Sequence, residues 1–318
     1  MSTPLLLHYA QKQFLSTTLS APEIKAPLLL YSLHPLHIHE LSASISLSCA
    51  AHHAAIVGFP TQSEPNIIPD YEVRLLLNPT AVLGPEHELT STVLSAFHIA
   101  PTVTRMGVQF LDKGSKEIYL AGWSTRIRKA ENENDFELTY KKRYPIVGGD
   151  VDAALTLANK DGLNATSTKY KAQVEWGYQK QTLSISRKKT ATDTGVGRID
   201  LPDTTNSRKM LIDEAPDKFD NFGSNKWGTS ALAVSRIFGP VLVRRSTGLW
   251  KGMQLYLEIW PILNSTGTGI EYIVEASFKT TCRMTASVKQ TELTAYLESQ
   301  GWLFAEDSLK TQLIMERY

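Results

Sequence analysis

The chain has 318 residues, of which 42% are hydrophobic and 20% are charged, and its formal net charge is +1. This length and composition predict one large folded domain or two modest ones, and they exclude a chain that is disordered throughout. The 33 basic and 32 acidic residues nearly balance, which argues against a dedicated nucleic-acid binder, since such proteins usually have a strongly basic face. If positive charge serves a function in this protein, it must therefore be concentrated in one part of the folded chain.

The cysteines and the apolar runs bear on where the protein works. Cys49 and Cys282 are far apart and lack the spacing of metal ligands, a pattern typical of a reducing compartment, so we expect a cytoplasmic protein. The sequence has no stretch of about 18 uninterrupted apolar residues, so we expect no membrane-spanning helix. No sequence pattern indicates an oligomeric state.

The first 66 residues differ in composition from the rest of the chain. They carry almost no charge and contain six of the eight histidines, and they end in the Pro- and Asn-containing segment TQSEPNIIPD. We expect residues 1–66 to form an N-terminal extension, either loosely ordered or packed against the main domain, and residues 67–318 to form that domain.

From residue 70 onward, alternating apolar and polar residues predict strands, with helical spacing between them. In chain order, strands are expected at 70–77, 108–112, 123–129, 135–146, 172–188 (one long strand or half of a hairpin), 240–245, 255–261 and 271–279. Helices are expected at 87–97, 148–162, 230–239, 288–301 and 306–318, the second with Asp150 as N-cap and Gly162 as its end. This order predicts an antiparallel α+β fold, a closed barrel with helices packed outside it.

Charged residues recur on one face of these strands, since residues two apart in a strand share a face. An exposed sheet would also alternate, but this face is rich in arginine and glutamate on at least five strands, and the opposite face is apolar enough to be covered by helices. We therefore expect the polar face to line the lumen of the barrel. Its candidate members are Glu72, Arg74, Leu76, Arg126, Arg128, Glu137, Thr139, Lys141, Arg143, Gln254, Tyr256, Glu258, Trp260, Glu271, Ile273, Glu275, Ser277 and Lys279.

Such a lumen suits a phosphorylated ligand. Arginine and lysine side chains that converge from several strands bind a multiply charged anion, above all a phosphate chain, through charge-assisted hydrogen bonds. Carboxylates among them supply the oxygen ligands that Mg²⁺ or Mn²⁺ prefers, and such ions typically bridge to substrate phosphates. The expected partner is a small phosphorylated molecule.

The ordered motifs YEVRLLL, QFLD, WSTRIRK, FELTYKKR, LYLEIWP and YIVEASFK resemble those of the CYTH-like, or triphosphate tunnel metalloenzyme, superfamily. Its members include thiamine, inorganic and RNA triphosphatases and a class of adenylate cyclase. The resemblance implies catalytic, metal-binding carboxylates at Glu72, Glu258 and Glu275, and an aspartate at Asp112. It also implies phosphate-binding residues at Arg126, Arg128, Lys141, Arg143, Arg236 and either Arg244 or Arg245, to which the lumen face adds Arg74, Lys279, Tyr256 and Trp260 as substrate-binding candidates.

The first strand departs from the E-x-E-x-K signature of that superfamily. Only Glu72 matches, because Arg74 stands at a metal-ligand position and Leu76 at the position of the lysine. Replacing an acid by a base changes the local charge by two units, which is enough to shift a two-metal site toward one bound Mg²⁺ or Mn²⁺ ion or none, and we expect one ion rather than two.

Three functions are compatible with these residues. The first is a Mg²⁺-assisted phosphohydrolase that cleaves a di- or triphosphate. The second is a lyase or cyclase that ionises an organic diphosphate such as an isoprenoid diphosphate, with Leu76, Tyr256, Trp260 and either Trp176 or Tyr178 facing the organic group. The third is a non-catalytic protein whose tunnel has lost its metal and binds a phosphorylated ligand or partner, an alternative that Arg74 and Leu76 motivate.

Overall fold

The computed structural model describes residues 64–193, 195 and 197–318. Almost all of the predicted N-terminal extension, residues 1–66, lies outside the described residues. None of the described helices is both long and apolar enough to cross a membrane.

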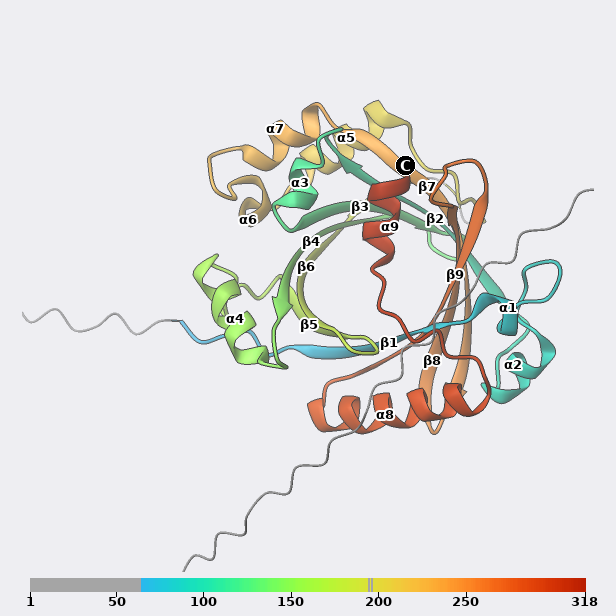
Figure 1. Cartoon of the computed structure of the whole chain (residues 1–318). Helices are drawn as coiled ribbons and strands as arrows, with labels where there is room; N and C mark the ends of the chain where they lie inside the picture. The colour runs from blue at the N-terminus through green and yellow to red at the C-terminus, as the bar shows by residue number, and fades with distance from the viewer. Residues whose placement is uncertain (1–63, 194, 196) are drawn as a thin grey trace, which may run out of the picture. The chain divides into compact units, whose positions relative to one another are not determined.

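Nine strands close into a single barrel, which Figure 1 shows along its axis. The strands follow one another around the barrel in the order β1, β5, β6, β4, β3, β2, β7, β8 and β9. Their bounds are Asp70–Leu77 (β1), Val103–Asp112 (β2), Trp123–Ala130 (β3), Phe136–Ile146 (β4), Lys171–Trp176 (β5), Gln181–Ala191 (β6), Arg236–Trp250 (β7), Met253–Leu263 (β8) and Ile270–Thr280 (β9). The predicted closed barrel is thus confirmed.

One strand pair departs from the expected antiparallel arrangement. β1 and β5 run parallel, with Glu72 beside Glu175, whereas the other neighbouring pairs are antiparallel. Because β1 also pairs with β9, with Leu76 beside Glu275, this first strand joins the two halves of the chain.

Short helices connect the strands and one long helix follows them. Their bounds are Pro79–Val82 (α1), Ser91–Ala96 (α2), Glu117–Leu120 (α3), Val151–Lys160 (α4), Thr204–Asp213 (α5), Asp217–Asp220 (α6), Trp227–Ala233 (α7), Arg283–Ser299 (α8) and Lys310–Arg317 (α9). The helix predicted at 148–162 is present as α4, and its predicted N-cap is confirmed, since the Asp150 side chain accepts a hydrogen bond of 2.9 Å from the Ala153 amide.

Several predicted bounds were wrong for local reasons. The helix expected from His87 begins only at Ser91, because Thr90 provides the N-cap and His87 has a positive φ of 57°. The segment 172–188 is two strands of a hairpin, β5 and β6, rather than one long strand. The helix expected at 230–239 already ends at Ala233 as α7, and β7 begins three residues later.

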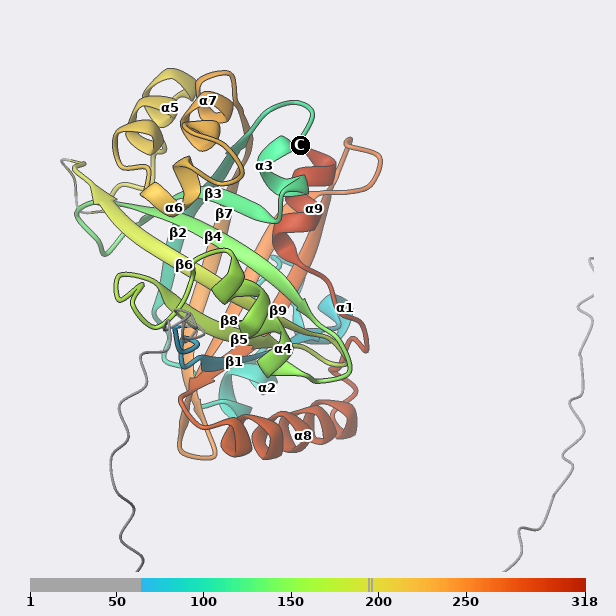
Figure 2. The same ribbon diagram turned by 90° about the vertical axis from the view of Figure 1, so that its left-hand side faces the viewer.

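Most of the helices pack against the apolar outer faces of the strands, as predicted. One buried cluster joins β1, β5, β8 and β9 to α4 and α8 through side chains such as Val73, Phe278 and Leu293. A second joins β3 and β4 to α5, α6 and α7, with Trp123, Tyr140 and Phe219 at its centre. In Figure 1 and Figure 2, α5, α6 and α7 lie above the barrel and α8 lies below it, so they cover opposite sides of its outer wall. This apolar packing leaves the inner faces free to be polar.

The last helix, α9, is the exception, because it contacts inward-facing side chains. Ile314 and Met315 are buried against Met106, Val108, Phe110, Phe238, Val241, Val243, Trp260 and Ile262, which β2, β7 and β8 contribute. Along the barrel axis, α9 appears within the ring of strands (Figure 1). The expectation that the helices pack outside therefore fails for α9, which fills part of the interior.

Candidate functional site

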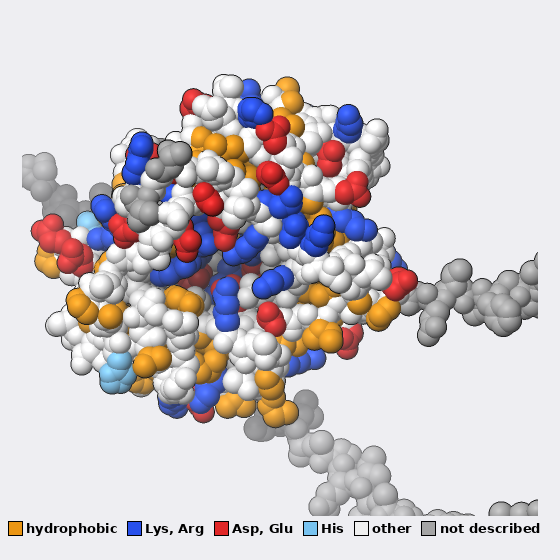
Figure 3. All heavy atoms as spheres, turned by 180° about the vertical axis from the view of Figure 1, so that it is seen from behind, with side chains coloured by type: hydrophobic (Ala, Val, Ile, Leu, Met, Phe, Trp, Pro, Cys, Tyr) orange, Lys and Arg blue, Asp and Glu red, His pale blue; other side chains and the backbone are white. Residues whose placement is uncertain are grey.

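The polar inner faces surround a cavity of about 290 Å³ in the barrel lumen. Nine basic and four acidic side chains line it, so positive charge prevails there although the whole chain is nearly neutral. The basic residues are Arg74, Arg126, Arg128, Lys141, Arg143, Lys188, Arg245, Lys279 and Lys310, and the acidic ones are Glu72, Glu175, Glu258 and Glu275. From the side opposite to that of Figure 1, Lys and Arg side chains surround a hollow at the centre of the molecule (Figure 3).

On β3 and β4, one carboxylate is shared among three cations. Glu137 accepts hydrogen bonds from Arg126 (2.9 Å), Arg128 (2.9 Å) and Lys188 (2.6 Å). Burial would raise the pKa of Glu137, but the neighbouring cations outweigh it and lower that pKa to about 2. Burial together with Arg126 lowers the pKa of Arg128 to about 10. This Glu137 cluster carries an excess of positive charge.

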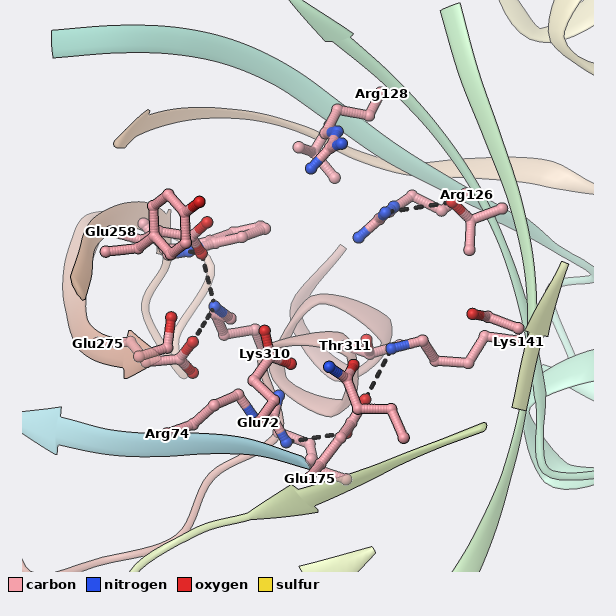
Figure 4. A pocket seen from close by; sticks show the side chains of 18 of the residues that line it. Glu72, Arg74, Arg126, Arg128, Lys141, Glu175, Glu258, Glu275, Lys310 and Thr311 are labelled. Atoms are coloured by element: carbon pink, nitrogen blue, oxygen red, sulfur yellow. Dashed lines mark hydrogen bonds and ion pairs between the residues drawn. The ribbon is translucent and has the colours of Figure 1, made fainter. Parts of the chain in front are cut away.

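On β1, β4 and β5, a second carboxylate holds three more cations. Glu175, whose side chain is 1% exposed, lies 2.8 Å from Arg74 Nη2, 2.7 Å from Lys141 Nζ and 3.5 Å from Arg143 Nε. Burial opposes ionisation of Glu175, yet the three cations hold its pKa well below the usual range. Burial also lowers the pKa of Lys141 to about 8, because burial together with the charge of Arg143 outweighs the opposite effect of Glu175. Of this Glu175 cluster, Figure 4 shows Arg74 and Lys141 directed toward Glu175.

On β8 and β9, two carboxylates flank a lysine of α9. Lys310 Nζ lies 2.8 Å from both Glu258 Oε2 and Glu275 Oε1 (Figure 4). Glu258 also accepts hydrogen bonds from Arg245, at 2.5 Å and 2.8 Å, and from Trp260 Nε1 at 2.9 Å. Burial alone would lower the pKa of Lys310, but the two carboxylates raise it, so this lysine is protonated at neutral pH.

The remaining predicted lumen residues complete the wall. Lys279 Nζ lies 3.4 Å from Glu72 Oε1 across the β1 and β9 pair. The Arg245 guanidinium lies 5.3 Å from the centre of the Tyr256 ring, and Lys310 Nζ lies 4.5 Å from that of Trp260. The aromatic side chains of β8 thus contact the cations of the cavity directly.

One side of the cavity is apolar. Met106, Val108 and Phe110 of β2 line it together with Trp260 of β8 and Leu309, which precedes α9. The charged residues come mainly from the other strands. The lumen therefore offers a bound molecule a cationic surface and, beside it, an apolar one.

Several cationic side chains keep donors without a partner. The Nε–H groups of Arg74 and Arg126 are buried and, among the described residues, donate no hydrogen bond. Arg143 Nε is likewise buried without a hydrogen bond and has only its 3.5 Å ion pair with Glu175. Since a buried donor without a partner costs free energy, these three groups favour an anionic ligand.

Several residues singled out in the sequence do not line this cavity. Arg236, at the start of β7, is exposed, donates to the Tyr318 carbonyl (2.7 Å) and lies over the Phe238 ring; it does not line the cavity. Asp112 accepts hydrogen bonds from the amides of Lys113, Ile118 and Tyr119, and thereby stabilises the turn into α3. Leu76 lines a smaller neighbouring pocket of about 100 Å³ with Leu309 and Asp307.

Three charged lumen residues, Glu175, Lys188 and Lys310, were not predicted from the sequence. Glu175 and Lys188 follow the same alternation that identified their neighbours, with Gln173 and Ser186 on the inner faces of β5 and β6, so that rule could have found them. Lys310 offered no such signal, because a helix rather than a strand places it in the cavity.

The carboxylates predicted to bind a metal do not form a vacant metal site. The part of the chain that the structure describes contains no group of three or more His, Cys, Asp and Glu side chains that could hold a metal ion. Glu258 and Glu275 face each other across β8 and β9, but the Lys310 ammonium lies between them, and Glu72 pairs with Lys279. The donor set therefore does not fit the predicted Mg²⁺ or Mn²⁺ ion.

Comparisons with known proteins yield matches of structure only. No family profile and no curated sequence matches the chain. A solved structure described as a putative adenylyl cyclase from Hippeastrum with a dominant triphosphatase activity matches with 17% identity and a TM-score of 0.45, over 78% of this chain and 99% of that one. A putative adenylate cyclase from Bacillus halodurans matches with 13% identity and a TM-score of 0.43, over 79% and 98%.

A putative adenylate cyclase from Vibrio parahaemolyticus matches with 10% identity and a TM-score of 0.39, over 77% of this chain and 98% of that one. Identities of 10–17% and TM-scores of 0.39–0.45 show what the chain is similar to and no more. The function proposed below is therefore derived from the lumen residues.

Proposed function

We propose that the barrel lumen binds the phosphate chain of a small phosphorylated substrate and catalyses cleavage of that chain. The observation that carries this proposal is the set of buried arginine Nε donors without hydrogen-bond partners, in a cavity with nine basic and four acidic side chains. A phosphate chain supplies acceptor oxygens for these donors and negative charge for the excess of cations.

The arrangement favours cleavage of a phosphoanhydride bond. In hydrolysis, water attacks a phosphorus atom and the bond from that phosphorus to the bridging oxygen breaks, so that negative charge develops on the departing phosphate oxygens. Cations fixed in place before the reaction stabilise that charge. The ion pairs of Arg126 and Arg128 with Glu137, and of Arg143 with Glu175, hold these guanidinium groups in position. These arginine side chains would thus neutralise the negative charge that a bound Mg²⁺ ion was expected to neutralise.

A second candidate function has its own supporting observation. Met106, Val108, Phe110 and Trp260 line one side of the same cavity. An organic diphosphate could place its apolar group there and its pyrophosphate among the cations, and loss of pyrophosphate would leave a carbocation beside an aromatic ring. Ligand binding without turnover is the third alternative.

A substrate panel tests these alternatives. Tripolyphosphate, ATP, thiamine triphosphate and geranyl, farnesyl and geranylgeranyl diphosphates are incubated with the protein, with Mg²⁺ or with EDTA, and phosphate, pyrophosphate and organic products are measured. Phosphate or pyrophosphate from a triphosphate supports hydrolysis, and a new terpene supports the second function. If no compound of the panel releases phosphate or pyrophosphate, the proposal that the lumen catalyses cleavage is wrong.

A paired variant assigns any activity to the lumen. The double variant Arg126→Gln/Arg128→Gln removes two cations from the cavity and should abolish turnover. Arg105→Gln is the matched control, because Arg105 pairs with Glu131 and its side chain is 55% exposed. Equal activity of the double variant and the control would exclude the lumen as the active site.

A further inference from the structure

We propose that the Lys310 ammonium takes the place of a divalent metal ion between Glu258 and Glu275, so that this lumen binds phosphate without a metal. The inference deepens the proposed function and rests on it for the identity of the ligand. Its structural basis is the position of Lys310 Nζ, 2.8 Å from one oxygen of each carboxylate.

The ion pairs leave little negative charge for a metal ion. Glu258 Oε2 and Glu275 Oε1 both accept from Lys310, while Glu258 Oε1 accepts from Arg245. Two carboxylates are thus balanced by two cations. A divalent ion between them would have to displace the ammonium into a cavity that already holds eight other basic side chains, where like charges repel it.

The segments on both sides of Lys310 fix its place. Just before it, Asp307 accepts hydrogen bonds from the backbone amides of Tyr178, Gln179 and Lys180, at 2.6, 2.8 and 2.9 Å, and so ties this segment to the turn between β5 and β6. Just after it, Ile314 and Met315 of α9 are buried in the apolar cluster of β2, β7 and β8. The ammonium is therefore held in place by the fold.

The charged residues of β1 agree with a lumen that binds phosphate without a metal. Arg74 stands on β1 within the cavity, where its guanidinium pairs with Glu175 and its charge disfavours a nearby cation. Glu72, the one acid of that strand that lines the cavity, pairs with Lys279. All three carboxylates predicted to bind the metal thus have a basic partner from the chain, and Lys310 serves two of them.

Metal binding tests the inference directly, independently of activity. Mn²⁺ is titrated into the wild-type protein, Lys310→Met and the control Lys289→Met, and the unbound ion is measured by electron paramagnetic resonance. Lys289 pairs with Glu292 of its own helix, α8, outside the cavity. We expect no stoichiometric Mn²⁺ binding by the wild type or the control. Lys310→Met should bind Mn²⁺ at least about tenfold more tightly than the wild type, because Glu258 and Glu275 lose the cation that they share.

Ligand binding provides the second arm. Calorimetry with tripolyphosphate should give a wild-type affinity that Mg²⁺ does not increase over EDTA. Stoichiometric Mn²⁺ binding by the wild type, or tripolyphosphate binding that needs Mg²⁺, would overturn the inference, and both tests hold even if Lys310→Met fails to fold. If tripolyphosphate does not bind under either condition, the proposed function fails, whereas the Mn²⁺ titration still decides the role of Lys310.

Discussion

Replacing Glu175 by glutamine should destabilise the free protein and strengthen its binding of phosphate chains. Glu175 is buried and is the shared counter-ion of Arg74, Lys141 and Arg143. Glutamine keeps the size of the side chain but removes its charge, so three buried cations lose their common partner. A phosphate chain in the lumen would then replace the missing negative charge.

The size of both effects follows from these contacts. Removing one partner of a buried ion pair costs about 3–5 kcal/mol, because the other charge stays buried. The cations around Glu175 have side-chain exposures of only 16–18%, so little of this cost is screened by water. At an effective dielectric constant of about 20, a unit charge pair at about 4 Å is worth about 4 kcal/mol. One extra net positive charge should therefore raise the affinity for tripolyphosphate at least about tenfold, which needs about 1.4 kcal/mol.

Urea unfolding and calorimetry measure the two effects. Glu175→Gln should unfold at a lower urea concentration than the wild type, and tripolyphosphate at about 100 times its Kd should restore about 2.7 kcal/mol. Glu292→Gln is the matched control, because Glu292 is also shared between two lysines but lies at the surface of α8. If Glu175→Gln is as stable as the control and binds tripolyphosphate no more tightly than the wild type, the account of the Glu175 cluster is refuted.

Three more predictions concern pH and the segment before α9. The pKa of Glu137 is lowered from 4.5 to about 2 in the folded protein, so the stability that its ionised form gives the protein is complete above pH 4.5 and is lost as the pH falls toward 2. In urea unfolding, acid should therefore lower the free energy of unfolding less in Glu137→Gln than in the wild type. The pKa of Lys141 is about 8, so tripolyphosphate affinity should fall as the pH rises above 8, whereas Lys141→Arg, which stays charged, should show no such fall in calorimetry. Asp307→Ala leaves three backbone amides without their acceptor and should lower the free energy of unfolding by about 1–3 kcal/mol, and a Tm equal to that of the wild type would contradict this role.

The alternation of side chains along the strands made most of the lumen predictable. Arg126, Lys141 and Glu258 line the cavity because residues two apart in a strand share a face. The same rule holds for Glu175, but β5 is only six residues long and runs into a turn, so its pattern gives a weak signal. The sequence thus predicted the cations of the lumen better than the carboxylate that holds three of them together.

Residues outside the strand interiors could not be placed by alternation. Lys310 reaches the cavity because α9 contacts inward-facing side chains, and no local pattern encodes that long-range contact. Arg236 has the parity of Phe238, which faces the apolar interior, but it lies at the strand end beside the chain terminus, where it bonds to Tyr318. The prediction that Glu258 and Glu275 bind a metal ion does not fit the structure for the same reason. The cation between these carboxylates, Lys310, belongs to α9, which is distant from both in the sequence.

Tripolyphosphate binding to the lumen is the most direct test of the central claim. Calorimetry in EDTA compares the wild type with Arg126→Gln/Arg128→Gln and with the outer-face control Arg105→Gln. A charge-assisted hydrogen bond is worth about 1.5–3 kcal/mol, so loss of the lumen arginines should weaken binding at least about tenfold, whereas the control should bind as the wild type does. Equal affinities in the three proteins, or no binding by the wild type, would contradict the account of this barrel as a phosphate-binding lumen.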